Sequence, residues 1–212
     1  MLGNFFRAPR RGHPSEELAP HLMRGWVGAG FPAKKGSPEA GMDVITAIKG
    51  RRSVRRFKGA EIEPEKIEAL KDALIWAPSA GNLQSRHFYF IYNAEVKKKL
   101  VDAALGQRFI LQAPLVVVGC ADLAIGDYYR ERGMYLYCIQ DVACSIQNMM
   151  LAAFGIGLGS VWVGAFEEDD VAKILNLPGH LRPLAIVPVG YPEQTPGTPK
   201  RVAHRDAVTE IR

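Results

Sequence analysis

"VACSIQNMMLAAFGIGLGSVWVGAF", residues 142–166, contains no charged residue and decides how the chain folds. Its length alone would allow a membrane span, which needs about 20 residues. However, Ser145, Gln147 and Asn148 interrupt the apolar run, the glycines of "GIGLG" break a helix, and the flanking residues are acidic rather than basic. The stretch therefore predicts a buried helix, a glycine turn and a buried strand, and no membrane span.

The helix in this stretch is expected to begin upstream and to run over about 134–154. Its few polar residues are Gln140, Asp141, Gln147 and Asn148. A helix that is apolar nearly all round is buried on every side. In a small domain, enclosure on every side indicates that a second subunit covers the helix.

Helices and strands intermix along the rest of the chain. Periodicity and Gly/Pro punctuation predict helices at about 43–50, 64–77, 96–105 and 167–175, and strands at 87–92, 114–121, 160–164 and 184–191. The first two strands are apolar on both faces, as in the interior of a sheet, and a polar loop is expected at 122–133. This order predicts an α+β or α/β domain with one central sheet flanked by helices.

Composition limits the classes of protein to which the chain can belong. A chain of 212 residues that is 48% hydrophobic can bury a full core, which predicts one domain over 42–212. Residues 1–41 are rich in Gly, Pro and Arg and are expected to form a basic, flexible extension, with Met42 as a candidate true start. The net charge of +5 favours anionic ligands but is too small to indicate nucleic acid.

Cysteines and histidines indicate neither disulfides nor a metal. Cys120, Cys138 and Cys144 form no CxxC pair and have apolar neighbours, so they are interpreted as reduced packing residues. Such usage fits a cytoplasmic compartment, and the N-terminus has no secretory pattern. The five histidines lack metal-ligand spacing, and no metal site is expected.

"GRRSVRRF", residues 50–57, follows the short first helix, which Asp43 is expected to cap. In an extended segment Arg51, Ser53 and Arg55 project to one side. Guanidinium groups and a hydroxyl match the oxygens of a phosphate monoester. The alternative interpretation of this segment is a solvated basic turn.

Three further segments offer polar groups. "APSAGNLQ", residues 77–84, places hydroxyl and amide side chains on a loop, where amides suit the heteroatom edge of a flavin ring. In "VWVG" the backbone N–H groups of Val163 and Gly164 are candidates to face a ligand. Lys200 and Arg201 follow a proline-stiffened segment that can return them to the same pocket.

Taken in order, "RRSVRRF", "APSAGNLQ", "YCIQDVACSIQNMMLAAFGIGLGSVWVGAF", "LNLP", "PVGYP" and "PKR" resemble the nitroreductase family of FMN-dependent oxidoreductases over about 43–202. The resemblance implies an α+β, nitroreductase-like fold. It also implies an intertwined homodimer with FMN at the subunit interface, which agrees with the all-round apolar helix.

The resemblance assigns roles to particular residues. Arg51–Ser53, with Lys200 and Arg201, would hold the phosphate and ribityl end of FMN, and Arg55 would lie near N1 and the C2 carbonyl, where it tunes the flavin. Pro78 and Ser79 would reach the FMN of the other subunit. The full implied cofactor-binding set is Arg51, Arg52, Ser53, Arg55, Pro78, Ser79, Asn82, Gln140, Val163, Gly164, Lys200 and Arg201.

The implied activity is hydride transfer from NADH or NADPH to FMN, followed by reduction of a nitroaromatic, quinone or similar small molecule in a ping-pong cycle. No catalytic side chain is required because FMN carries the chemistry. Two alternatives remain open at this stage. One is a flavoenzyme of the same fold with another chemistry, such as reductive dehalogenation or flavin destruction. The other is a non-catalytic flavin- or anion-binding module.

Overall fold

The computed structural model describes residues 42–212, and the expected extension at 1–41 lies outside this range. Four antiparallel strands form one sheet in the order β1-β2-β4-β3. Their bounds are β1 Arg86–Ile91, β2 Leu115–Asp122, β3 Gly159–Ser160 and β4 Leu181–Gly190. The two long central strands, β2 and β4, have buried side chains along most of their length and form the middle of the domain.

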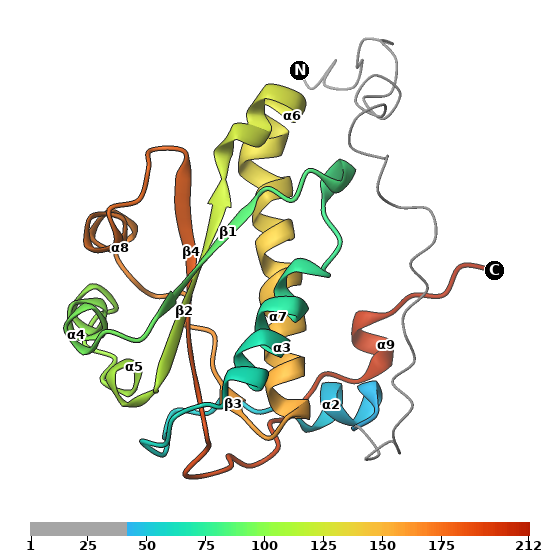
Figure 1. Cartoon of the computed structure of the whole chain (residues 1–212). Helices are drawn as coiled ribbons and strands as arrows, with labels where there is room; N and C mark the ends of the chain where they lie inside the picture. The colour runs from blue at the N-terminus through green and yellow to red at the C-terminus, as the bar shows by residue number, and fades with distance from the viewer. Residues whose placement is uncertain (1–41) are drawn as a thin grey trace, which may run out of the picture.

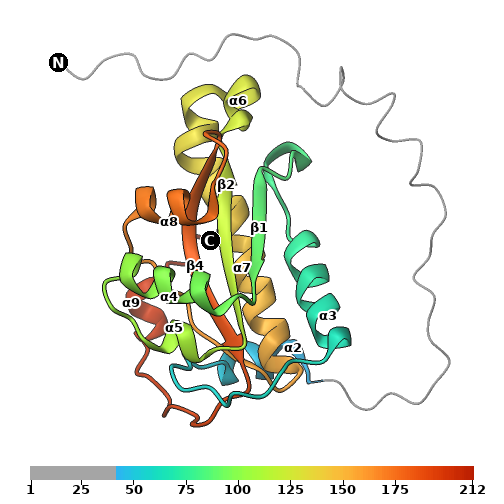
Figure 2. The same ribbon diagram turned by 60° about the vertical axis from the view of Figure 1, so that its left-hand side comes forward.

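Helices cover both faces of this sheet. Figures 1 and 2 show α3 and α7 on one face and α4, α5 and α8 on the other. The helices are α2 Val44–Gly50, α3 Pro64–Ile75, α4 Ala94–Ala103, α5 Phe109–Gln112, α6 Gly126–Arg132, α7 Cys138–Gly155, α8 Glu168–Leu175 and α9 His204–Ala207. Short turns η1 (Ala80–Asn82), η2 (Leu123–Ile125) and the π-helical η3 (Gly133–Tyr137) join them. The predicted α+β class, with one sheet flanked by helices, is confirmed.

The sheet separates two hydrophobic cores because successive side chains of a strand point to opposite faces. From β2, Leu115 and Val117 pack in the core beneath α3 and α7, whereas Val116 and Val118 pack in the core beneath α4, α5 and α8. All four side chains are fully buried. Each contributes about 1.5–3 kcal/mol through removal of apolar surface from water.

Local sequence signals set the first two helices. The Asp43 Oδ1 accepts hydrogen bonds from the backbone N–H groups of Ile45 (3.0 Å) and Thr46 (3.1 Å), so the predicted N-cap of α2 is confirmed. Pro64 occupies the first turn of α3 as expected. The apolar stripe of α3, which includes Leu70, is buried against α7.

Three expectations about secondary structure are wrong. β1 was expected in the sheet interior, but it is an edge strand and is mostly half-buried, because its apolar residues pack beneath flanking helices rather than between two strands. The expected loop at 122–133 is largely helical, as η2 and α6. The expected strand at 160–164 pairs only at its start, in β3, and continues as an isolated bridge between Val163 and Ile186.

Helix α7 is not enclosed on every side by its own chain. Gln140, Cys144 and Gln147 are exposed along one stripe of the helix, while the opposite side packs in the core. Cys144 is therefore not a packing residue within one chain, unlike the buried Cys120 and Cys138. Coverage of this stripe by a second subunit stays a prediction. Within residues 42–212 no helix combines the length and apolar character needed to cross a membrane.

Candidate functional site

Three arginines gather where α2 ends, and we call Arg51, Arg52 and Arg201 the arginine corner. Arg51 and Arg52 both lie along a small cavity of about 30 Å³, together with the buried Ser160 of β3. Arg201 comes from the C-terminal segment and is close enough for its charge to lower the pKa of Arg51. The corner thus joins segments from the start, middle and end of the described chain.

One nitrogen of Arg51 is left without a hydrogen-bond partner within residues 42–212. Its Nη1 is buried and has no hydrogen-bond partner among the described residues. Burial lowers the pKa of Arg51, and the positive charges of Arg201 and Arg52 lower it further. Arg51 as a whole is half-buried, and a buried, unpaired nitrogen among like charges is costly, so this geometry favours an anion at the corner.

Arg52 is used differently from its neighbour. Its Nη1 donates to the carbonyl oxygens of Lys49 (2.7 Å), Gly50 (2.9 Å) and Arg51 (2.9 Å), which are at the C-terminal end of α2. Its Nη2 donates to Oγ1 of Thr198 over 2.6 Å. Arg52 therefore stabilises the helix end and holds the C-terminal segment, and Arg51 is the guanidinium left for a ligand.

The remaining residues predicted at this corner lie nearby in sequence with different surroundings. Ser53 forms a backbone bridge to Ser160 of β3, and the next residue, Val54, is buried. Arg55 is exposed, as is Lys200 next to Arg201. The prediction that Arg51, Ser53 and Arg55 project together to one side is not borne out, because Arg51, Arg52 and Val54 line the cavity and Ser53 and Arg55 do not.

The segment after β3 offers one free amide rather than two. The Val163 N–H donates to the carbonyl of Ile186 (2.9 Å), so the prediction that this N–H faces a ligand is wrong; pairing with β4 uses it. Gly164 is exposed, and within residues 42–212 its N–H has no backbone partner. Gln107 Nε2 donates to the carbonyl of Ala165 (3.1 Å), the residue after Gly164, and so holds the backbone of this segment. No sequence pattern had singled out Gln107.

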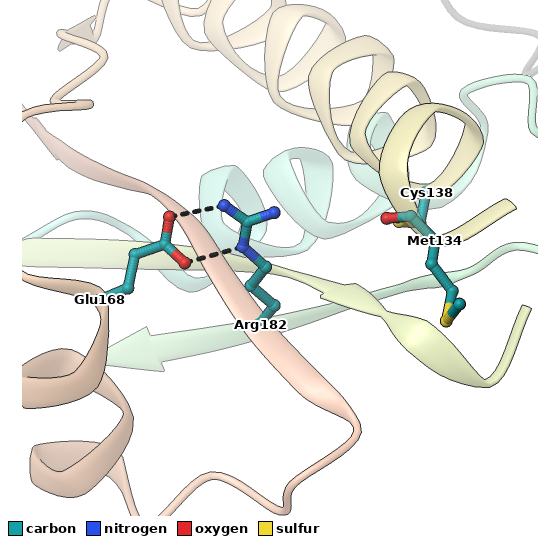
Figure 3. A network of polar contacts seen from close by, with 4 residues as sticks. All are labelled: Met134, Cys138, Glu168 and Arg182. Carbon is teal, nitrogen blue, oxygen red and sulfur yellow. Dashed lines mark hydrogen bonds and ion pairs between the residues drawn. The ribbon is translucent and has the colours of Figure 1, made fainter. Parts of the chain in front are cut away.

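Figure 3 shows a second support for the same segment. Arg182 of β4 donates from Nε to Glu168 Oε2 (2.7 Å) and from Nη2 to Glu168 Oε1 (2.8 Å). Glu168 begins α8, four residues after Gly164. To the right of this pair in Figure 3 lies the buried Cys138, whose thiol donates to the carbonyl of Met134. The bidentate pair fixes the start of α8 on the sheet.

The 77–84 loop lies at the other end of α7. Gly81, Asn82 and Gln84 all have left-handed backbone, with φ of 56°, 55° and 55°. Ser79 Oγ accepts from the Gln84 N–H (3.0 Å), and Pro78 is exposed at the start of the loop. Non-glycine residues adopt this conformation only when their surroundings impose it.

Two charged residues hold this loop. Arg86 of β1 donates to the carbonyl oxygens of Ile75 (2.9 Å), Ala77 (2.8 Å) and Pro78 (3.1 Å), where α3 ends. Asp141 Oδ1 accepts from the Ala80 N–H over 2.9 Å. Sequence reasoning treated Asp141 only as a polar interruption of a helix. The sequence offered one signal for this role: Asp141 directly follows Gln140, which was already a candidate for the site.

One chain does not bring the two groups of predicted residues together. Phe154 of α7 lies at the cavity of Arg51, whereas Asp141 contacts the 77–84 loop. At 1.5 Å per residue these two positions on α7 are about 20 Å apart. Figure 1 shows α2 near one end of α7 and α6 at the other. Gln140 is exposed at the loop end.

Other chemistry is not apparent at the site. Within residues 42–212 no group of three or more His, Cys, Asp or Glu side chains is arranged to hold a metal ion. The most strongly shifted thiol, Cys120, has its pKa raised to about 12 by burial, which disfavours the nucleophilic thiolate. The arginine corner is suited to binding an anion.

Comparisons with known proteins identify what the chain is similar to. The model of the Nitroreductase family matches residues 48–191, which include Arg51, Arg52 and the 77–84 loop. A protein of Methanothermobacter thermautotrophicus whose name includes NAD(P)H nitroreductase is 32% identical over 161 residues, or 74% of this chain and 81% of the relative. The structure of the NfrA1 nitroreductase from B. subtilis has a TM-score of 0.74 at 26% identity, over 80% of this chain and 74% of that one. The NADPH:FMN oxidoreductase from Vibrio harveyi, solved with NAD+, has a TM-score of 0.72 at 26% identity, over 80% and 77%.

Proposed function

Because this chain belongs to the nitroreductase family, we propose that it is an FMN-dependent oxidoreductase that uses NADH or NADPH to reduce a nitroaromatic, a quinone or a similar small molecule. The observation that carries the proposal is the arginine corner. Arg51 Nη1 is buried without a partner, and among residues 42–212 no carboxylate pairs with any of its three arginines. Relatives named for FMN support flavin as the ligand.

The corner fits the phosphate of FMN. A phosphate monoester carries nearly two negative charges at pH 7 and accepts several hydrogen bonds. Arg51 offers a free guanidinium edge, Arg201 and Lys200 add positive charge, and Ser53 adds a hydroxyl. Burial, and after it the charges of Arg201 and Arg52, lowers the pKa of Arg51, and a bound anion would oppose this lowering by stabilising the charged guanidinium.

The ring of the cofactor is assigned to the segment that continues from Ser160. Gly164 lies four residues further along an extended chain, about 13 Å away at strand spacing, and its exposed amide is a donor for the ring edge. Arg55 is assigned to the N1 and C2 carbonyl region, where a fixed cation stabilises negative charge. Gln107 and Arg182 hold the backbone of this segment, directly and through Glu168.

When bound, FMN supplies the redox chemistry: a hydride from the nicotinamide is stored and then delivered to the acceptor, in a ping-pong cycle. The chain's own residues bind and orient. Arg51 neutralises the phosphate, and Arg55 sets the electrostatics near the ring. Gly164 and Ala165 are exposed, and we assign the approach of nicotinamide and acceptor, in turn, to this side of the ring.

A homodimer completes the proposed site. Pro78, Ser79 and Asn82 are about 20 Å from the arginine corner of their own chain along α7. If two copies of α7 pair in antiparallel fashion and their exposed stripes cross near Gln147, midway between Asp141 and Phe154, the loop of one copy lies beside the corner of the other. This arrangement would also cover α7, the apolar helix whose sequence predicted a second subunit.

Anaerobic spectroscopy of the purified protein tests the proposed function. We expect stoichiometric FMN binding and bleaching of the flavin band by NADH or NADPH, with parallel double-reciprocal plots when a quinone or nitroaromatic is varied. Flavin binding without bleaching would show a non-catalytic module. Bleaching without turnover of any nitroaromatic or quinone, but with dehalogenation or flavin breakdown, would show another chemistry. Failure to bind FMN would overturn the proposal.

A further inference from the structure

We propose that Asp141 is a positioning residue that fixes the 77–84 loop against a flavin held by the arginine corner of a second copy of the chain. The inference rests on the proposed function and adds a residue that no sequence pattern had assigned to the site. Asp141 would not touch the flavin. It would act through the loop, whose backbone it holds.

The side chain of Asp141 contacts the 77–84 loop and the residues that follow it. The residue is only 3% exposed, and its Oδ1 accepts the Ala80 N–H at 2.9 Å. Burial raises the pKa of Asp141, while the backbone amides of Ala80 and Ser85 and the charge of Arg86 oppose that rise. Its Oδ2 is buried and has no hydrogen-bond partner among residues 42–212. Because a buried carboxylate is costly, the bond from Ala80, together with the nearby Ser85 amide and the charge of Arg86, is what offsets its burial.

The loop needs this anchor. Asn82 and Gln84 hold left-handed backbone that costs about 1–3 kcal/mol per residue unless the surroundings enforce it. Arg86 fixes the beginning of the loop through three carbonyls, and the Ser79 hydroxyl closes it onto Gln84. Asp141 is the tie between the middle of the loop and α7, the helix of the proposed dimer interface.

The geometry makes the effect intermolecular. Along α7, Asp141 and the loop are about 20 Å from the cavity of Arg51 in the same chain. A loop displaced by loss of Asp141 would therefore affect the flavin bound at the partner's corner, while the flavin at its own corner stays intact. Substitutions of Asp141 and Arg51 should consequently complement each other across a dimer.

The first experiment compares Asp141→Ala with Asp141→Asn. The asparagine carbonyl can accept the same Ala80 N–H, so we expect Asp141→Asn to stay within about threefold of the parent in FMN affinity. Asp141→Ala should weaken FMN binding by about tenfold or more, as expected for loss of a hydrogen bond to a charged group. The matched control is Asn93→Ala, which removes a similar cap bond to the Val96 N–H of α4 and should leave FMN affinity unchanged.

Amide hydrogen exchange of the FMN-free proteins measures the anchor itself. We expect faster exchange at Ala80 and in the 77–84 peptide of Asp141→Ala only, with the parent rate retained in Asp141→Asn and Asn93→Ala. Equal exchange in the Asp141→Ala and parent proteins would overturn the inference, whether or not either protein binds FMN. Faster loop exchange in Asp141→Ala than in the parent, together with no FMN binding by the parent, would instead overturn the proposed function alone.

The second experiment uses heterodimers purified with two affinity tags. A dimer of one Arg51→Ala chain and one Asp141→Ala chain contains one site with both defects and one site with neither. We expect one high-affinity FMN per heterodimer, against none in either variant homodimer. Two weakened sites per heterodimer would show that Asp141 acts within its own chain and would overturn the proposed action across the interface.

Discussion

Arg52 Nη2 donates to Thr198 Oγ1 over 2.6 Å and joins residues that are 146 positions apart in the chain. The same guanidinium closes the end of α2 through three carbonyls. This one side chain therefore couples the first helix to the C-terminal segment that carries Arg201. Arg201 contributes its charge to the corner only while this segment is held beside α2.

Loss of the Thr198 hydroxyl should loosen the C-terminal segment. We expect Thr198→Val to weaken FMN binding by about two- to fivefold, because an exposed hydrogen bond contributes little and the other charges remain. Fluorescence quenching of free FMN measures the effect. Thr209→Val, an exposed change further along the same segment, is the control. Unchanged FMN affinity in Thr198→Val would show that the segment is held without Arg52.

Removal of Arg51 should affect the phosphate specifically. We expect Arg51→Ala to weaken FMN binding by about 10- to 100-fold, the worth of a charge-assisted contact, and to leave riboflavin binding nearly unchanged. Isothermal titration with both flavins gives the comparison. Lys99→Ala removes one exposed positive charge from α4 and controls for net charge. An equal loss for riboflavin would contradict the phosphate assignment.

The fold could be predicted from the sequence where one physical signal dominates. Asp43 and Pro64 mark helix starts, and the long apolar runs of β2 and β4 indicate buried strands. The position of β1 at the sheet edge was not predictable, because an apolar run is also found where helices partly cover an edge strand. Order within a sheet is set by distant contacts.

The site was predictable as a set of segments, not as a geometry. Clustered arginines indicate an anion, but which guanidinium is free depends on Arg52 reaching carbonyls and Thr198. The roles of Asp141 and Gln107 depend on backbone groups that are remote in sequence and carry no residue-type signature. Val163 looked available because its pairing with Ile186 is an isolated bridge.

Cys144 reports on the proposed dimer. It lies on the exposed stripe of α7, whereas Cys120 and Cys138 are buried and their pKa values are raised by burial. We expect slow alkylation of Cys144 at concentrations where the protein is dimeric and faster alkylation on dilution, with no fast reaction at all in Cys144→Ser. Rapid, complete labelling of Cys144 in a species of dimer mass would contradict α7 as the interface.

The ion pair between Glu168 and Arg182 predicts a pH-dependent stability difference. The pKa of Glu168 is lowered from its ordinary 4.5, because the Arg182 guanidinium donates to the carboxylate and attracts its charge, although partial burial opposes the shift. A carboxyl group whose pKa is lower in the folded state contributes stability above its unfolded pKa. That contribution disappears as the pH falls through the folded value.

Glu168→Gln should therefore destabilise the fold at neutral pH and converge with the parent in acid. The side chains of Glu168 and Arg182 are 43% and 38% exposed, so we expect a loss of no more than about 1 kcal/mol at pH 7. Urea unfolding at steps from pH 7 to pH 3 measures the difference, which should shrink below about pH 4.5. Asp169→Asn removes an unpaired acid from the same first turn of α8 and controls for the helix dipole. A difference that persists unchanged at pH 3 would mean that packing of the side chain, and not its charge, stabilises the start of α8.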